Sequence, residues 1–272
     1  MRASRLLWVL AILLLSCFVC AQDYTAIRGN WHLTGSWDPS SSMSPRLALS
    51  IGVEGDEVFA MGGISVSCPN RVGVGAALSP RGRIAADGTF LLKGGDITVS
   101  GRVPDPGSEH WAGHYQFSAS TAKGQCSAEG DFVATKLPAL NGVYSGTLHL
   151  LDHSGDVTVT IEVSQGELLR LDYLYWLPVQ ATMQLSGSGE FPSEELKTAK
   201  FPPENKDEAA KAGQTGICCH IDGDHFIMVL AASSGEQMML GASFVDATEQ
   251  SLRVSLENMG SKNVAMGTLT RQ

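Results

Sequence analysis

Short stretches in which apolar and polar residues alternate run along most of the chain. In the first, at about 28–36, Trp31 and Leu33 alternate with more polar neighbours. A period of two residues is typical of a half-buried β-strand. Turns rich in Gly, Asn and Asp separate it from further strands, which we expect at 47–53, 58–60, 64–68, 72–78, 89–93, 97–103, 110–117 and 126–135. The pattern predicts an all-β protein.

The second half of the chain repeats this plan. Further strands are expected at 142–150, 157–163, 169–176, 180–185, 217–221, 225–231, 237–245, 251–257 and 264–270. Each half opens on a glycine followed two residues later by an aromatic, as Gly29-Asn30-Trp31 and Gly142-Val143-Tyr144. We therefore predict two tandem antiparallel β-barrel-like modules, at 28–137 and 141–272, with a short joint around Pro138 between them.

The spacing of the two modules indicates one insertion. From Gly29 to Gly130, near the end of the first module, is 101 positions, and from Gly142 to Gly267 is 125. The excess of 24 equals the length of the stretch 192–215, which is polar and contains a double proline. We predict that 192–215 is an insertion loop without strands in the second module. A loop of this length is often functional or mobile, but we favour a tolerated surface insertion over a lid.

The net charge of the chain limits the classes of binding partner that we expect. The formal net charge is −9, and removal of a leader with Arg2 and Arg5 leaves −11. A chain this acidic repels phosphate backbones, and it contains no basic cluster, so nucleic-acid binding is not expected.

The N-terminus predicts export. Arg2 and Arg5 precede an apolar run that is too short to span a membrane, which is typical of a signal peptide at 1–21. Val19-Cys20-Ala21 favours ordinary cleavage before Gln22. Leu14-Leu15-Ser16-Cys17 resembles a bacterial lipobox, which would instead leave a lipid anchor on Cys17. Either route leads to the periplasm, the cell surface or secretion.

Four cysteines remain after the leader, namely Cys68, Cys126, Cys218 and Cys219. An exported chain meets an oxidising compartment, so disulfides are expected, and four cysteines allow three pairings. Their places within the modules favour a disulfide between Cys68 and Cys126. For the adjacent pair, a vicinal disulfide, two free thiols and a bond between modules all stay open.

The stretch from Cys218 to His225 is the best candidate for metal chemistry. Asp222-Gly223 predicts a two-residue hairpin loop that places His220 opposite His225, with Cys218 on the same face. Cys218, His220 and His225 would then be three ligands suited to zinc or copper. The alternative, which we favour, is a solvated hairpin tip without a cofactor, because a structural zinc site needs four ligands.

Aromatic residues on the inward faces suggest a ligand site. They are Trp31, Trp111, Tyr115, Tyr144 and Tyr175. In an eight-stranded barrel such residues fill the core, which is their commoner use, or surround one small apolar ligand. Nucleophile elbows, phosphate loops and the His-Glu-x-x-His motif are absent from the sequence. A Ser-His-Asp set stays open, because such triads are assembled in space, but nothing in the sequence points to one. We therefore expect no enzymatic activity.

The opening Gly29-Asn30-Trp31 resembles that of lipocalin-like (calycin) barrels. The doubled pattern is also similar to uncharacterised exported β-rich bacterial proteins. This resemblance implies lipocalin- or streptavidin-like barrels and export from the cytoplasm, and it supplies no ligand residues. We expect a non-enzymatic protein that binds a small apolar ligand or a protein partner at a barrel mouth. A structural envelope or surface protein with filled barrels is the alternative.

Overall fold

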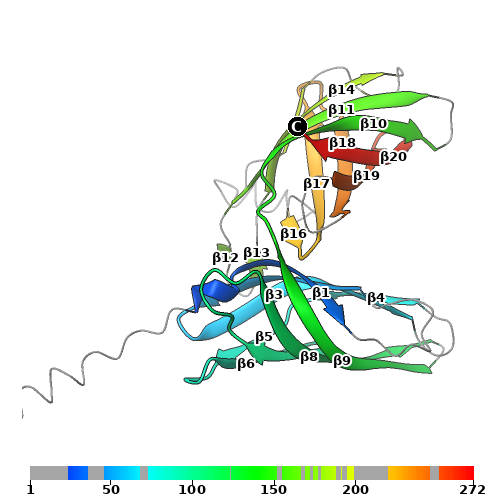
Figure 1. The fold of residues 1–272 in the computed structure, drawn as a ribbon. Helices are drawn as coiled ribbons and strands as arrows, with labels where there is room; N and C mark the ends of the chain where they lie inside the picture. Colours follow the sequence, from blue (N-terminus) through cyan, green and yellow to red (C-terminus); the bar gives the residue numbers. More distant parts are fainter. Residues whose placement is uncertain are drawn as a thin grey trace, which may run out of the picture.

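The fold is described from a computed structural model of the chain (Figure 1). The residues described are 24–35, 46–67, 73–122, 124–151, 155–166, 169–171, 174–176, 179–187, 191, 195–198, 220–245 and 251–272. The predicted leader at 1–21 and Cys17 lie outside these residues. The described part of the chain contains no helix of the length and apolar character needed to cross a membrane.

The prediction of two tandem antiparallel barrels is confirmed. In the first, eight strands form a closed ring in which each strand pairs with the next ring strand along the chain and the last pairs with the first. Its strands are β1 (Gly29–Gly35), β2 (Arg46–Glu54), β3 (Glu57–Ser67), β5 (Arg81–Ile84), β6 (Thr89–Gly94), β7 (Ile97–Arg102), β8 (His110–Thr121) and β9 (Gly124–Leu137). Outside the ring, β4 (Gly73–Leu78) pairs with β3, and the short 3-10 helix η1 (Thr25–Ile27) precedes β1.

The second barrel has the same next-neighbour topology, closed by pairing of β15 with β17. Its ring strands are β10 (Gly142–Leu150), β11 (Asp156–Gln165), β14 (Val179–Gly187), β15 (Leu196–Thr198), β17 (His225–Ala232), β18 (Gln237–Phe244), β19 (Ser251–Asn258) and β20 (Val264–Arg271). Outside this ring, β16 (His220–Asp222) pairs with β17, and β12 (Leu169–Leu171) pairs with β13 (Leu174–Trp176).

Alternation along the strands explains the two cores. In β11 buried and exposed residues alternate almost without interruption, so Val157, Val159, Ile161 and Val163 face the interior. Each barrel has its own cluster of buried apolar side chains. Because a period of two places every second residue inward, a closed sheet with a filled interior satisfies this pattern.

The repeated Gly-x-aromatic opening occupies the same place in both barrels. Gly29 and Gly142 begin the first strands with φ of +126° and +125°, a region that favours glycine. Trp31 and Tyr144 follow them and are both fully buried. The sequence repeat is therefore also a repeat of conformation and burial.

A basic residue on the last strand completes this repeated arrangement. Lys136 of β9 lies opposite Trp31, and Arg271 of β20 lies opposite Tyr144. The Lys136 ammonium lies 5.4 Å from the centroid of the Trp31 ring, within the range of a cation–π interaction. The first and last strands of each barrel thus pair at equivalent positions.

Some strands differ from the prediction. The expected strands 58–60 and 64–68 are one continuous strand, β3, and β5 was not predicted. The prediction that 192–215 lacks strands is wrong at β15, which pairs with β14 and β17. Leu196 in β15 is fully buried, so pairing across the barrel outweighs the polar composition of its surroundings.

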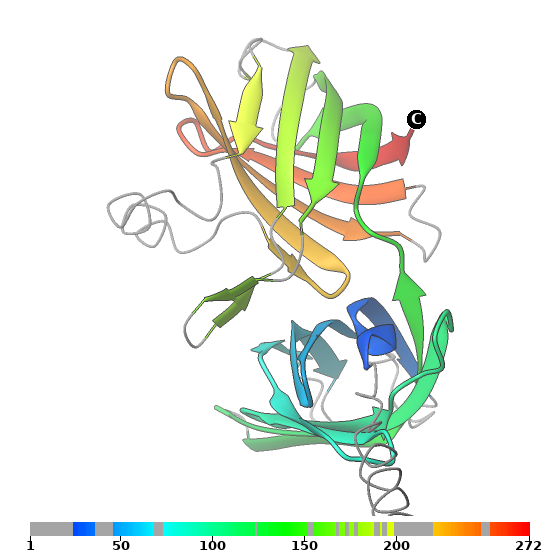
Figure 2. The ribbon, with the colours of Figure 1, turned by 90° about the vertical axis from the view of Figure 1, so that its left-hand side faces the viewer.

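The two barrels lie one above the other, and β9 leads directly from one to the other (Figure 1). The hairpin formed by β16 and β17 extends from the second barrel to the first, as Figure 2 also shows. It reaches β2, where seven consecutive residues, 47–53, are buried. A strand covered on one face alone would bury alternate residues, so both faces of β2 are covered, the outer one by this hairpin.

Candidate functional site

The tip of the β16–β17 hairpin docks on the outer face of β2. Gly223 has a φ of +66°, and a Cβ atom there would lie 2.4 Å from the backbone carbon of Ala48. Its N–H donates a hydrogen bond to Ser50 Oγ at 2.9 Å. Glycine is required at this position for two reasons, since it permits both the backbone conformation and the close approach of the barrels.

Asp224, the next residue, makes the ionic contact between the barrels. Its Oδ2 accepts a hydrogen bond from Arg46 Nε at 2.8 Å and lies 2.6 Å from Arg46 Nη2. His32 Nδ1 lies 3.2 Å from the same oxygen. Burial raises the pKa of Asp224, but the hydrogen bonds from His32 and Arg46 and the charge of Arg46 outweigh it and hold that pKa below its ordinary value. Asp224 is therefore ionised at neutral pH.

A second group of hydrogen bonds fixes the joint between the barrels. Ser50 Oγ donates to Asn30 Oδ1 at 2.9 Å, and Asn30 Nδ2 donates to Gln165 Oε1 at 3.1 Å. Gln165 Oε1 also accepts from the backbone N–H of Leu140, in the segment that connects the barrels. Ser50 and Asn30 are nearly fully buried. The barrels are thus held by a buried polar network as well as by the chain connection.

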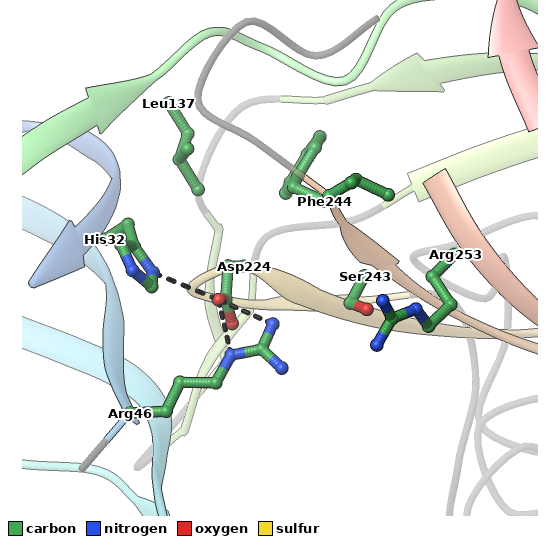
Figure 3. Close-up of a pocket in the computed structure, with 8 residues that line it drawn as sticks. His32, Arg46, Leu137, Asp224, Ser243, Phe244 and Arg253 are labelled. Atoms are coloured by element: carbon green, nitrogen blue, oxygen red, sulfur yellow. Dashed lines mark hydrogen bonds and ion pairs between the residues drawn. The ribbon is translucent and has the colours of Figure 1, made fainter. Parts of the chain in front are cut away.

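A cavity of about 230 Å³ lies beside this contact and is named here the inter-barrel cleft (Figure 3). Its walls come from both barrels and consist of His32, Arg46, Leu137, Asp224, Ser243, Phe244, Val245 and Arg253. Arg253 and Ser243 lie opposite each other on neighbouring strands of the second barrel. The cleft therefore combines polar donors with apolar walls, which is common in ligand sites between domains.

The predicted aromatic ligand residues lie elsewhere. Trp31, Trp111, Tyr115 and Tyr144 are at most 5% exposed and belong to the two cores. The ring of Trp111 contacts Trp31 edge-on at 6.0 Å between centroids. Tyr175 lies on β13, and its side chain is outside the described part. None of the four described aromatic residues lines the inter-barrel cleft, and ligand binding by them stays a prediction.

The predicted metal site rested on a hairpin register that is wrong. His220 lies opposite Ile227, and His225 lies opposite Asp222. The loop is Gly223-Asp224, one residue later than predicted, because Gly223 takes a positive φ at the first loop position, as a type II′ turn requires. Within the described residues, no three His, Cys, Asp or Glu side chains gather where they could hold a metal. Cys218 lies outside them.

The structure describes one of the two cysteines of the predicted disulfide. Cys126 on β9 is 1% exposed and belongs to the core of the first barrel. Cys68 and Cys219 lie outside the described residues. The pairing of Cys68 with Cys126 therefore stays a prediction.

One row of side chains on the outer wall of the first barrel includes a serine, a histidine and an aspartate. His114 lies opposite both Ser100 and Asp131, and its Nδ1 is 2.9 Å from Asp131 Oδ1. Ser100 Oγ donates to the backbone oxygen of His114 and not to its ring. Asp131 is also largely exposed. This row therefore lacks the serine–imidazole contact that activates a nucleophile.

Sequence reasoning missed the residues of the inter-barrel cleft. Arg46 and Asp224 are 178 positions apart and meet only through the packing of the barrels. The one local signal was Gly223, since a glycine at a hairpin tip permits close approach to another backbone. In comparisons with known proteins, no protein-family model and no curated protein matches this chain.

Proposed function

We propose that this chain is an exported, non-enzymatic binding protein that holds a small ligand in the inter-barrel cleft. The observation that carries the proposal is the construction of the cleft. Residues from both barrels line it, and a hairpin locked by Gly223 and Asp224 fixes its walls. A cleft whose walls are held in place loses little entropy on binding, which favours affinity.

The position of the cleft differs from the barrel mouth expected from the sequence. The four described aromatic residues expected to surround a ligand are packed in the cores. In contrast, the side chains of Ser243 and Arg253 in the cleft have no hydrogen-bond or ion-pair partner among the described residues. Groups whose hydrogen-bonding capacity is unused are available to a ligand. The support for a ligand therefore lies between the barrels.

A structural envelope or surface protein is the second candidate. It is favoured by the density of the first core, where Trp111 makes edge-on contacts with Phe90 and Phe132 at 5.3 and 5.0 Å between centroids. Two filled barrels in a fixed arrangement suit a spacer or a scaffold for a protein partner. In that case the inter-barrel cleft would have no ligand.

Export and ligand binding are tested separately. Intact-mass spectrometry of the protein recovered outside the cytoplasm gives the processing route. Ordinary cleavage leaves Gln22 as the first residue, and lipoprotein processing leaves a lipid on Cys17.

Binding is tested with benzyl alcohol and benzoate as probes in ligand-observed NMR. A Ser243→Trp variant fills the inter-barrel cleft and is expected to abolish the saturation-transfer signal of benzoate.

The control is Ser255→Trp, on the neighbouring strand of the same barrel and outside the cleft lining. It is expected to leave the signal unchanged. If neither probe binds, or if Ser243→Trp and Ser255→Trp affect binding equally, the proposed function is wrong.

A further inference from the structure

We infer that the inter-barrel cleft recognises a small organic anion, with its carboxylate at Arg253 and Ser243 and its apolar part against Leu137 and Val245. This inference rests on the proposed function and adds the chemical class of the ligand.

The charges of the cleft favour an anion. Among the described residues that line it, Asp224 is the one acidic side chain, and its Oδ2 is already shared by Arg46 and His32. Arg253 brings a further positive charge, and no ion pair with a described residue compensates it. The cleft is therefore locally positive in a chain whose formal net charge is −9. An anion at Arg253 would supply the opposite charge that no described side chain provides there.

The donors of the cleft suit a carboxylate. Figure 3 shows the Arg253 guanidinium beside Ser243, and the Arg46 side chain extends into the same cleft from the first barrel. A guanidinium offers two parallel N–H donors that match the two oxygens of a carboxylate. The Ser243 hydroxyl supplies a further donor.

The size and apolar walls limit the rest of the ligand. The volume of about 230 Å³ lies below the range of roughly 300–1,000 Å³ typical of sites for drug-sized ligands. Leu137 and Phe244 are nearly buried, while Val245 is 50% exposed and gives an apolar surface at the edge of the cleft. A single ring or short chain with one carboxylate therefore fits better than an extended molecule.

The experiment compares benzoate with its neutral counterpart, benzyl alcohol, by NMR titration of the full chain. Benzoate is expected to bind the native protein about tenfold more tightly, and Arg253→Gln is expected to remove this preference by weakening benzoate alone. Arg102→Gln, an exposed arginine of the first barrel, is the control and is expected to change neither affinity. Inorganic phosphate, which lacks an apolar part, is expected to compete weakly.

The outcomes separate the inference from the proposed function. If Ser243→Trp abolishes binding but benzoate and benzyl alcohol bind equally, the cleft is a ligand site and the anion inference is wrong. The same conclusion follows if Arg253→Gln leaves benzoate binding unchanged. If phosphate displaces benzoate at equal concentration, the apolar part of the inference is wrong. In a further outcome, Arg253→Gln loses the binding of both probes while its circular dichroism spectrum is unaltered. The two probes would then share a site that does not select for charge, and this outcome would also overturn the inference.

Discussion

Arg46 Nη2 lies 2.6 Å from Asp224 Oδ2, and this ion pair joins two barrels that each have their own core. The Asp224 side chain is 8% exposed, whereas the Arg46 side chain is 41% exposed. The pair therefore lies at the edge of the interface, with its acidic partner buried and its basic partner open to solvent on one side of the inter-barrel cleft.

Replacement of Asp224 by asparagine is expected to weaken the joint. Asn keeps the size of the side chain but removes the charge that Arg46 and His32 share, which costs about 1–2 kcal/mol after allowance for the partly exposed arginine. Urea denaturation followed by circular dichroism measures the loss. The control is Asp156→Asn, because Asp156 contacts His149 at 2.7 Å with both side chains more than half exposed. It is expected to cost less than about 0.5 kcal/mol, and an equal cost in both variants would contradict a role in the joint.

Two glycines with similar φ angles allow the cost of backbone strain to be measured separately from the cost of losing the close contact between the barrels. Gly223 has a φ of +66° and lies against the backbone of Ala48, while Gly55 has a φ of +62° and no described atom within 4 Å of the place that a Cβ atom would take. Gly55→Ala is expected to cost about 1–2 kcal/mol from backbone strain alone. Gly223→Ala carries the same strain and also pushes the hairpin off β2.

Small-angle X-ray scattering distinguishes the two glycine variants. The radius of gyration is expected to rise in Gly223→Ala, because the barrels separate, and to stay unchanged in Gly55→Ala. An unchanged radius in both variants, with equal losses of stability, would show that the hairpin does not hold the barrels together.

The depressed pKa of Asp224 predicts a pH dependence of the joint. A carboxyl whose pKa is lower in the folded than in the unfolded protein stabilises the fold above the unfolded value and loses that effect as the pH falls through the folded value. The difference in unfolding free energy between the native protein and Asp224→Asn is therefore expected to be constant from pH 7 to about pH 5 and to shrink below the ordinary value of 3.8. A difference that does not begin to shrink as the pH falls below 3.8 would contradict this assignment.

The sequence predicted the strands with a clear local pattern and failed where contacts between distant segments decide. In β11 the alternation of valine and isoleucine with polar residues specifies both the strand and its inward face. In β15 three residues become a strand only because β14 and β17 lie on either side. The one-residue shift in the β16–β17 loop has the same origin, since Gly223 and Asp224 are positioned by Ser50 and Arg46 of the other barrel.

The site was less predictable than the fold for a related physical reason. The inward aromatic residues are visible in the sequence because burial follows a period of two, and that same burial places them in the cores. Arg253 and Ser243 lie on outward positions, where a sequence shows only ordinary polar residues. They line a cleft only because the first barrel faces them, and no local sequence pattern encodes the position of that barrel.

Two tryptophans in the first core provide a matched test of buried hydrogen bonding. Trp31 Nε1 donates to the backbone oxygen of Ile27 at 2.7 Å, whereas the buried Trp111 Nε1 has no hydrogen-bond partner among the described residues. Trp→Phe removes a similar volume at both positions, so the costs of the cavities largely cancel. Trp31→Phe also deprives Ile27 of its donor, while Trp111→Phe removes a buried unpaired N–H.

Trp31→Phe is therefore expected to be less stable than Trp111→Phe by about 2 kcal/mol. Denaturation of the two variants in urea, monitored by far-ultraviolet circular dichroism, gives the difference directly. If Trp111→Phe were instead the less stable variant, the Trp111 N–H must have a hydrogen-bond partner in solution, for example a water molecule within the barrel. The loss of that hydrogen bond would then add to the cost of the cavity at position 111.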